Sequence, residues 1–257
     1  MFRNLAKMAA GLITVIISLA FTPACAADEV KLAFGSLQRD TSFSAGNCPS
    51  CYDLLGEVEV KNLAYAKEVW IWYNTGTGGW KAKQATYDAQ IGNNKETWDF
   101  SINLGVISPA NVQLAIQYKV NGQTYWDNNN TQNYTLGTPA AFSVLNTLKL
   151  FPTNTVFAMF DKFHGEIVVK NIAYQKQVKV LYTLDGWATS HEVQSTFKAT
   201  DGALAETWEF TADIPLFYSD ALPTIEYAIA YTVGGVTYWD NNHNRNYKVT
   251  RFMGATR

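Results

Sequence analysis

Short stretches of alternating apolar and polar residues run along most of the chain, and glycine, asparagine and other turn residues separate them. In the first half they cover residues 57–61, 68–73, 96–103, 113–120 and 123–127. A period of two is typical of strands that bury one face, whereas the long 3.6-residue periodicity of amphipathic helices is missing beyond the N-terminal apolar run. The pattern predicts an all-β protein built from β-sandwiches.

The same sequence blocks occur twice, in the same order. The blocks read Gly-Glu-x-x-Val-Lys-Asn-x-Ala-Tyr, Glu-Thr-Trp-x-Phe and Trp-Asp-Asn-Asn. They lie at 56–65 and 165–174, at 96–100 and 206–210, and at 126–129 and 239–242. This repeat indicates two related domains of ordinary size in tandem. We predict that the domains span 28–136 and 139–251, with residues 137–141 as a short join.

A hairpin near the end of each copy fixes the direction of a tryptophan. Asn121-Gly122 is typical of a two-residue type I′ turn, which places Gln117 opposite Trp126. The apolar residues of the incoming strand define its core face, so that Trp126 lies on the opposite, solvent face. The second copy places Trp239 opposite Ala230 in the same way. We predict one solvent-facing indole in each domain; cover by a loop or by the sister domain is the alternative.

Composition and charge then narrow the choice of ligand. Only 16% of the 257 residues are charged, and 14% are aromatic. The formal charge is −2, and the sequence contains no basic stripe of the kind that nucleic-acid binders carry. We therefore expect a neutral ligand and no nucleic-acid partner. An indole face beside neutral amides suits the C–H face and the hydroxyl rim of a sugar ring.

Residues 1–26 are predicted to be a signal peptide. A positive start with Arg3 and Lys7 precedes an apolar run and an Ala24-Cys25-Ala26 cleavage pattern. The run is too short for a comfortable membrane span and no second run follows, so no transmembrane segment is expected. The sequence predicts a secreted or periplasmic protein. A lipid anchor on Cys25 is less favoured, because Thr22-Pro23-Ala24 matches the lipoprotein box poorly.

Two further cysteines lie close together, as Cys48-Pro49-Ser50-Cys51. A redox role would need a βαβ context and a zinc site would need a second ligand pair, and the sequence offers neither. In an exported protein this spacing favours a local disulfide between Cys48 and Cys51.

Recurring carboxylates do not indicate catalysis or metal binding. Asp127 and Asp240 recur, but each lies in a block that the hairpin explains, and a Gly-x-Ser-x-Gly nucleophile elbow is missing. Asp127-x-Asn129-x-Thr131 resembles the start of a calcium loop, yet Gln132 stands where that loop needs glycine. We predict a non-catalytic protein without a metal or cofactor.

Nearly the whole chain beyond the leader resembles two tandem starch-binding domains of the family 21 carbohydrate-binding modules. These modules occur in fungal glucoamylases and in the glycogen-targeting subunits of protein phosphatase 1. The resemblance is carried by Val-Lys-Asn-Leu-Ala-Tyr-Ala-Lys at 60–67, its copy at 169–176, and the hairpin at 116–129 with its Asn-Tyr at 133–134. It implies two immunoglobulin-like sandwiches that bind α-1,4-glucans such as starch, glycogen and maltooligosaccharides.

The resemblance also implies two sugar sites in each domain. The first, the hairpin site, combines a loop tryptophan, the hairpin tryptophan and loop amides: Trp80, Trp126, Asn128, Asn130 and Asn133, then Trp187, Trp239, Asn241 and Asn246. The second, the tyrosine site, comprises Tyr65, Lys67 and Tyr87, then Tyr174, Lys176 and Phe197. A third aromatic of the hairpin site falls on Ala115 and Ala228, and His243 replaces a loop amide. We expect weak binding by each domain and a gain in affinity when one polymer spans both.

Other aromatic residues divide into two groups. Trp98 and Trp208 lie on predicted strands and are expected to anchor the cores. Trp70 and Trp72 share one face of a strand, which is either buried only in the first domain or an extra sugar contact there.

Two functions stay open. In the first, the protein binds α-glucans outside the cell, with a secreted amylolytic enzyme as a candidate partner. In the second, it is a secreted structural or protein-interaction module that keeps the scaffold without binding sugar.

Overall fold

The computed structural model describes residues 28–39, 51–107, 112–137, 142–153, 156–201, 204–215 and 224–250. The first ten strands are β1 (Val30–Arg39), β2 (Cys51–Lys61), β3 (Lys67–Asn74), β4 (Lys81–Gln84), β5 (Thr86–Ile91), β6 (Lys95–Val106), β7 (Val112–Val120), β8 (Gln123–Asp127), β9 (Tyr134–Leu136) and β10 (Phe142–Leu145). The next ten are β11 (Leu150–Pro152), β12 (Phe157–Met159), β13 (Lys162–Lys170), β14 (Lys176–Thr183), β15 (His191–Gln194), β16 (Thr196–Asp201), β17 (Ala205–Asp213), β18 (Thr224–Val233), β19 (Val236–Asp240) and β20 (Tyr247–Thr250). No helix occurs among these described residues.

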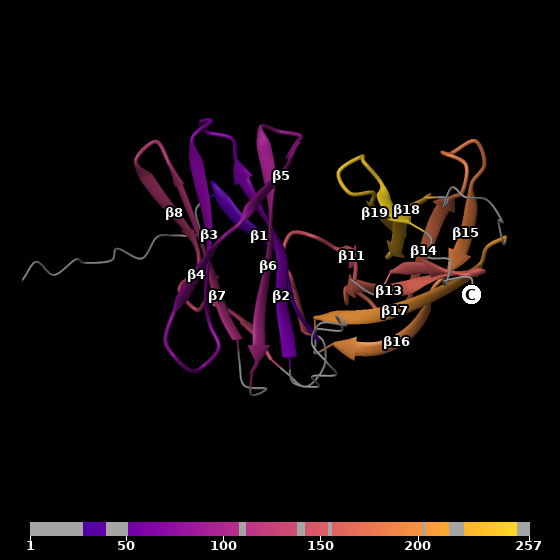
Figure 1. Cartoon of the computed structure of the whole chain (residues 1–257), viewed down its shortest axis with the longest axis horizontal. Coiled ribbons are helices and arrows are strands. Elements are labelled where there is room, and N and C mark those ends of the chain that lie inside the picture. The colour runs from indigo at the N-terminus through magenta and orange to yellow at the C-terminus, as the bar shows by residue number, and fades with distance from the viewer. Residues whose placement is uncertain are drawn as a thin grey trace, which may run out of the picture.

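The strands form four antiparallel sheets, two in each half of the chain. In the first half the orders are β10-β1-β2-β6-β5 and β4-β3-β7-β8, with β9 beside β7. In the second they are β11-β13-β17-β16, with β12 beside β13, and β15-β14-β18-β19, with β20 beside β18. Figure 1 shows the two halves as separate sandwiches side by side. The predicted all-β fold of two tandem sandwiches is confirmed.

Each sandwich has its own core, built by the alternation along its strands. Val69 and Ile71 of β3 and the apolar face of β7 are completely buried in the first domain, and Val178 and Val180 of β14 are buried in the second. Equivalent buried tyrosines in the two domains make the same hydrogen bond. The hydroxyls of Tyr118 and Tyr231 donate 2.7 Å hydrogen bonds to the carbonyls of Lys61 and Lys170, respectively. Such bonds offset the cost of burying a polar group.

Close packing requires glycine at the first position of the repeated Gly-Glu block. A Cβ on Gly56 would collide with the Phe100 ring and with the carbonyl oxygen of Phe34, and one on Gly165 would collide with Val156. The neighbouring strand backbone and side chain pack directly on these positions, which only a residue without a side chain allows.

The passage between the domains differs from the predicted join. Strand β10 lies after residues 137–141 but pairs with β1, so that the first sandwich extends to Leu145. The chain then crosses at residues 146–149, where Thr147 N–H donates a 3.1 Å hydrogen bond to the Ala33 carbonyl. An apolar contact follows, in which the rings of Phe34 and Phe151 stack 4.1 Å apart beside Val168. Pairing of β10 completes the edge of the first sheet, which a boundary drawn from the repeats alone cannot detect.

Several sequence predictions concern regions outside the described residues. The signal peptide at 1–26, with Cys25, is one of these, and so is Cys48. Cys51, at the start of β2, is disulfide-bonded. Within the described ranges, none of the segments forms a helix with the length and apolar character that crossing a bilayer requires.

Candidate functional site

The hairpin register is confirmed residue by residue. Asn121 and Gly122 have φ angles of 51° and 73°, as a type I′ turn requires. Gln117 pairs with Trp126, and Ala230 pairs with Trp239. Trp239 is 55% exposed, whereas Trp126 is half-buried. Both indoles therefore lie on the outer face of their sheet, and the one in the first domain has neighbours that partly cover it.

The aspartate after each hairpin tryptophan holds the following loop in place. The carboxylate of Asp127 accepts hydrogen bonds from the Leu32 N–H at 2.7 Å and from the Tyr134 hydroxyl at 2.9 Å. Asp240 accepts one from Tyr247 at 2.8 Å, and burial raises the pKa of Asp240 to about 6. These repeated carboxylates are structural, which agrees with their assignment to the hairpin rather than to catalysis.

The asparagines of this loop have a conformational role as well as a chemical one. Asn129, Asn130 and Asn133 have positive φ angles, which asparagine tolerates better than most residues. The side-chain oxygen of Asn128 accepts a hydrogen bond from the Thr131 N–H at 2.9 Å. In the second domain Asn241 accepts one from Asn244 at 3.0 Å, and Asn246 again has a positive φ. The structure thus places the predicted amides together, and Asn128 and Asn241 also stabilise their own loops.

Among the described ring contacts, none joins a loop tryptophan to the hairpin tryptophan of its domain. Trp80 is 42% exposed and lies just before β4, while the ring that stands beside Trp126 is that of Trp72, 6.1 Å away. Trp187 is 37% exposed, and its Nε1 donates a 2.9 Å hydrogen bond to Glu226 of β18. Trp72 is thus the ring that contacts Trp126, and the roles of Trp80 and Trp187 in the hairpin sites stay predictions.

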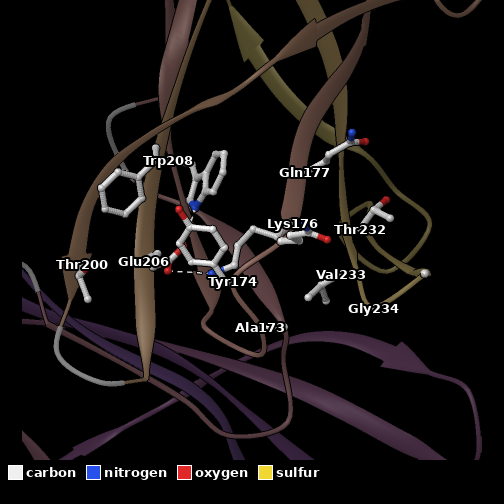
Figure 2. Close-up of a pocket in the computed structure, with 13 residues that line it drawn as sticks. Ala173, Tyr174, Lys176, Gln177, Thr200, Glu206, Trp208, Thr232, Val233 and Gly234 are labelled. Carbon is white, nitrogen blue, oxygen red and sulfur yellow. Dashed lines mark hydrogen bonds and ion pairs between the residues drawn. The ribbon is translucent and has the colours of Figure 1, made fainter.

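The predicted tyrosine site of the second domain is an open hollow of about 1310 Å³. Tyr174 is 98% exposed and Phe197 is 53% exposed, and both line it together with Trp208 (Figure 2). Beneath them the Lys176 ammonium lies 2.7 Å from Glu206, with both side chains almost fully buried. The hollow thus has aromatic walls over an ion pair whose charges compensate each other.

The ion pair and the aromatic side chains support one another. Lys176 also donates to the Asn171 side chain at 2.7 Å, and Trp208 Nε1 donates to Glu206 at 3.1 Å. Phe197 meets Trp208 edge to face at 6.1 Å, a favoured aromatic geometry. The lysine and the glutamate therefore hold the aromatic rings in place from below.

The first domain repeats this geometry. Tyr65 is 101% exposed, and Tyr87 meets Trp98 edge to face at 5.8 Å. Lys67 lies 2.7 Å from Glu96, which also accepts a hydrogen bond from Trp98 Nε1 at 3.4 Å. The ion pair and the edge-to-face aromatic contact thus recur in both domains, and in the second domain one hollow brings together Tyr174, Lys176 and Phe197.

Trp98 and Trp208 belong to these sites as well as to the cores for which they were predicted. Each packs against its core cluster but stays half-buried, and each bonds the glutamate two residues earlier on its strand. A sequence signal existed, because residues two apart on a strand share one face. The Glu-x-Trp spacing that both copies share could therefore have indicated the site.

The second hairpin loop contacts the first domain. His243 Nε2 lies 3.0 Å from the Glu57 carboxylate, and the Arg245 guanidinium binds both oxygens of Asp88 at 2.8 and 2.7 Å. Figure 1 shows this loop, between β19 and β20, projecting towards the first sandwich. The first loop carries Asn130 and Gln132 at the equivalent positions. The replacement of the loop amide by His243 thus creates a contact between domains, which we call the interdomain latch.

The latch also contains the group of described residues that could hold a cation. Ligand atoms of Glu57, Asp88 and His243 lie within 4.8 Å of one another. In the structure these atoms bind one another, Arg245 and Thr97 instead. Their arrangement is that of a salt-bridge network between the domains.

We expect the latch to weaken as the pH rises. The hydrogen bond to Glu57 raises the pKa of His243 above its ordinary value of 6.5, so its contribution is complete below pH 6.5 and is lost as the pH rises through the raised value. The charged groups that face His243 are Glu57, Asp88, Asp99, Asp240 and Arg245. Between pH 6 and 8.5 the radius of gyration, measured by small-angle X-ray scattering, should increase. The His243→Asn variant should show no such change, and an equal response of both proteins would contradict the assignment.

Comparison with known proteins agrees with the duplicated architecture. The chain matches the family described as carbohydrate/starch-binding module (family 21) over residues 41–137 and again over 153–250. It is 40% identical to glucoamylase 1 of Rhizopus oryzae over 88 residues, which cover 32% of this chain and 14% of that protein. It is 31% identical to protein phosphatase 1 regulatory subunit 3C of Bos taurus over 90 residues, 33% of this chain and 27% of that protein. The matched part is thus well under a third of either relative.

Among solved structures, the chain is similar to the starch-binding domain of Rhizopus oryzae glucoamylase in complex with β-cyclodextrin and maltoheptaose. The sequence identity is 32%, the match covers 40% of this chain and 92% of that chain, and the TM-score is 0.30.

Proposed function

This chain belongs to the carbohydrate/starch-binding modules of family 21, and we propose that it binds α-1,4-glucans such as starch, glycogen and maltooligosaccharides without transforming them. One observation carries the proposal. Tyr65 and Tyr174 are fully exposed at equivalent positions, and each domain carries an edge-to-face aromatic pair, which in the second domain lines one hollow with Tyr174. Aromatic rings that stay exposed to water at equivalent positions of both domains indicate a ligand that covers them.

The chemistry of the tyrosine sites favours a neutral sugar. Lys176 is the cation in the described lining of the hollow, and Glu206 compensates its charge at 2.7 Å. The hollow is otherwise lined by aromatic, aliphatic, hydroxyl and amide groups, among them Gln177, Thr200 and Thr232. Aromatic faces accept the C–H side of a pyranose, and the hydroxyls and amides exchange hydrogen bonds with its rim.

A non-catalytic role is supported by the state of the carboxylates. Hydrolysis of a glycosidic bond uses two carboxyl groups that flank the bond, one of them as acid. In the tyrosine site, Glu206 is held by Lys176 and Trp208, and in the hairpins the repeated aspartates hold their loops. These groups are committed to structure, and the sites are therefore suited to binding.

We further propose that the protein acts outside the cytoplasm, where it tethers or delivers glucan. The leader pattern of residues 1–26 and the disulfide-bonded Cys51 support an oxidising compartment. A lipid anchor on Cys25 would be the cell-surface form of the same proposal. A secreted amylolytic enzyme is the partner that such a tether would assist.

Titration of the protein with maltoheptaose and soluble starch, followed by tryptophan fluorescence, tests the proposal. The Tyr65→Ala, Tyr174→Ala double variant should lose roughly tenfold in affinity per site, since about 60 Å² of apolar contact is worth about 1.5 kcal/mol. Trp126→Ala with Trp239→Ala reports the hairpin sites separately. The exposed Phe160 serves as a control, and Phe160→Ala should bind as the wild type does.

The outcome separates the two open functions. Saturable binding that the tyrosine variant loses supports the glucan-binding function. No change in fluorescence or in heat of binding with either ligand would overturn it and favour a structural or protein-interaction module. The observation that favours this second function is the interdomain latch, in which a hairpin loop contacts protein.

A further inference from the structure

The outer face of the β4-β3-β7-β8 sheet carries an aromatic surface that the second domain lacks. Along β3, Val69 and Ile71 point into the core, and Trp70 and Trp72 are half-buried on the other side. Cross-strand pairing sets Trp70, Gln117 and Trp126 side by side on β3, β7 and β8. Trp72 is one step further along the same face. Three indoles thus lie together on one sheet; we call them the indole surface.

The cross-strand neighbours of Trp72 are small. Its cross-strand partners are Ala82 on β4 and Ala115 on β7. Its Nε1 donates a 3.2 Å hydrogen bond to the side-chain oxygen of Gln117, which fixes the orientation of the ring. A large indole between two alanines is held by this bond and by Trp126 rather than enclosed by the sheet.

The two closest rings are tilted rather than coplanar. The centroids of Trp72 and Trp126 lie 6.1 Å apart, and their planes meet at 47°. In an α-1,4-linked glucan, successive rings turn relative to one another, so that adjacent sugars present their faces at different angles. A tilted pair of indoles matches such a curved chain better than it matches a flat ribbon.

The rest of the surface is polar without a net charge. At its edge, Trp70 Nε1 donates to Glu68 at 2.9 Å, and the Lys119 ammonium lies 5.8 Å from the Trp70 ring. One acidic and one basic side chain thus flank the ring, and Gln117 is a neutral amide. This combination of indoles and neutral polar groups favours a sugar over a charged ligand.

The second domain has no equivalent of this surface. Lys179 and Leu181 stand where the first domain has Trp70 and Trp72, and Lys179 forms an ion pair with Glu192 at 3.0 Å. Figure 1 shows β3, β7 and β8 on the side of the first domain that faces away from the second. The indole surface is therefore particular to the first domain and is not covered by its described neighbour.

We propose that Trp72 and Trp70 extend the predicted hairpin site at Trp126 into a glucan-binding surface along the β3–β7–β8 face of the first domain, separate from the tyrosine sites. The proposal rests on the proposed function, since it assumes an α-glucan ligand. It makes the two domains unequal, because the first has an extended surface in addition to its tyrosine site. Trp72 is the residue on which the surface depends, since it bridges Trp126 and the β4 edge.

Oxidative footprinting of the wild-type protein tests the proposal without a substitution. N-bromosuccinimide oxidises accessible indoles, and peptide mass spectrometry reports each one. Saturating maltoheptaose should protect Trp72 and Trp126 at least threefold relative to the same protein oxidised without ligand.

Substitution gives the second measurement. Trp72→Leu introduces the residue found at the equivalent position 181, and it should weaken maltoheptaose binding about fivefold in a background where Tyr65 and Tyr174 are alanine. Leu181→Ala is the matched control and should leave binding unchanged, and thermal melts confirm that both variants fold.

The results distinguish this proposal from the proposed function. A wild-type protein that binds maltoheptaose but leaves Trp72 unprotected, with Trp72→Leu binding normally, overturns the proposal and leaves the tyrosine sites standing. The indoles would then be cross-strand packing or a protein contact. A wild-type protein that binds no glucan overturns the proposed function itself.

Discussion

Replacement of Lys176 by methionine is expected to lower the free energy of unfolding of the second domain by about 3–5 kcal/mol. The lysine and Glu206 are almost fully buried and lie 2.7 Å apart. Methionine fills a similar volume but leaves the largely buried Glu206 without its cationic partner. Removal of one partner of a buried pair costs far more than loss of a surface salt bridge. Hydrogen–deuterium exchange of second-domain peptides, read with urea denaturation, measures the loss.

A double variant shows whether the loss of stability comes from breaking the ion pair or from the change in side-chain volume. In Lys176→Met with Glu206→Gln, the glutamine can still accept the hydrogen bond of Trp208 Nε1, and no buried charge remains. More than half of the lost stability should return. First-domain peptides, which contain the equivalent Lys67–Glu96 pair, should be unaffected by either variant. If the single variant loses less than about 1 kcal/mol, the buried Lys176–Glu206 pair does not stabilise the second domain as we expect.

The same variant separates two roles of the lysine. The sequence comparison predicts that Lys67 and Lys176 contact sugar, whereas in the structure each ammonium is bound by a glutamate and an asparagine. If the lysine only supports the aromatic rings, Lys176→Met should bind maltoheptaose normally wherever its domain is folded. If it contacts sugar, binding weakens even in the folded domain.

Local chemistry explains what could be predicted from the sequence. The Asn121-Gly122 turn and the alternation of β7 fix the hairpin register, so the outward direction of Trp126 follows from two short-range rules. The family resemblance implies a tyrosine site in each domain, because Tyr65 and Tyr174 occupy the same place in the duplicated blocks that carry the resemblance. Residues near one another in sequence determine these features.

What the sequence did not reveal depends on contacts between distant segments. His243 and Glu57 are 186 positions apart, and nothing near either residue indicates that a loop of one domain reaches a strand of the other. Strand β10 joins the first sheet although it follows the predicted join. The contact of Trp72 on β3 with Trp126 on β8 crosses the intervening strand β7, so it becomes evident only once β3 is placed beside β7. Interdomain and cross-sheet contacts of this kind need coordinates.

The asparagine-rich loops show how one signal can have two causes. The sequence predicts amides that face a sugar, and the structure shows that several of these residues also adopt left-handed backbone conformations, as Asn130 and Asn133 do. Both demands select asparagine. Composition alone could not separate the residue that closes the loop from the residue that meets a ligand.

The second large effect concerns the joint action of the two domains. We expect Tyr174→Ala with Phe197→Ala to lower the apparent affinity for soluble starch by about 100-fold, because a tethered second site typically adds two to four orders of magnitude. The two residues form the exposed wall of the second-domain hollow, and neither takes part in the buried ion pair. The variant should therefore remain folded while it loses one of the two tyrosine sites.

Short and long ligands respond differently if this explanation holds. Maltoheptaose is too short for one molecule to bridge the two domains as its main mode of binding. Its affinity for the intact first-domain site should therefore change less than twofold, while the number of molecules bound per protein falls. The latch holds the domains in one relative orientation through Arg245 and Asp88, which sets the distance that a starch chain must span. Equal losses for maltoheptaose and for starch would show that the domains bind independently. A large loss confined to starch would show that the duplication provides affinity through linkage rather than through a stronger single site.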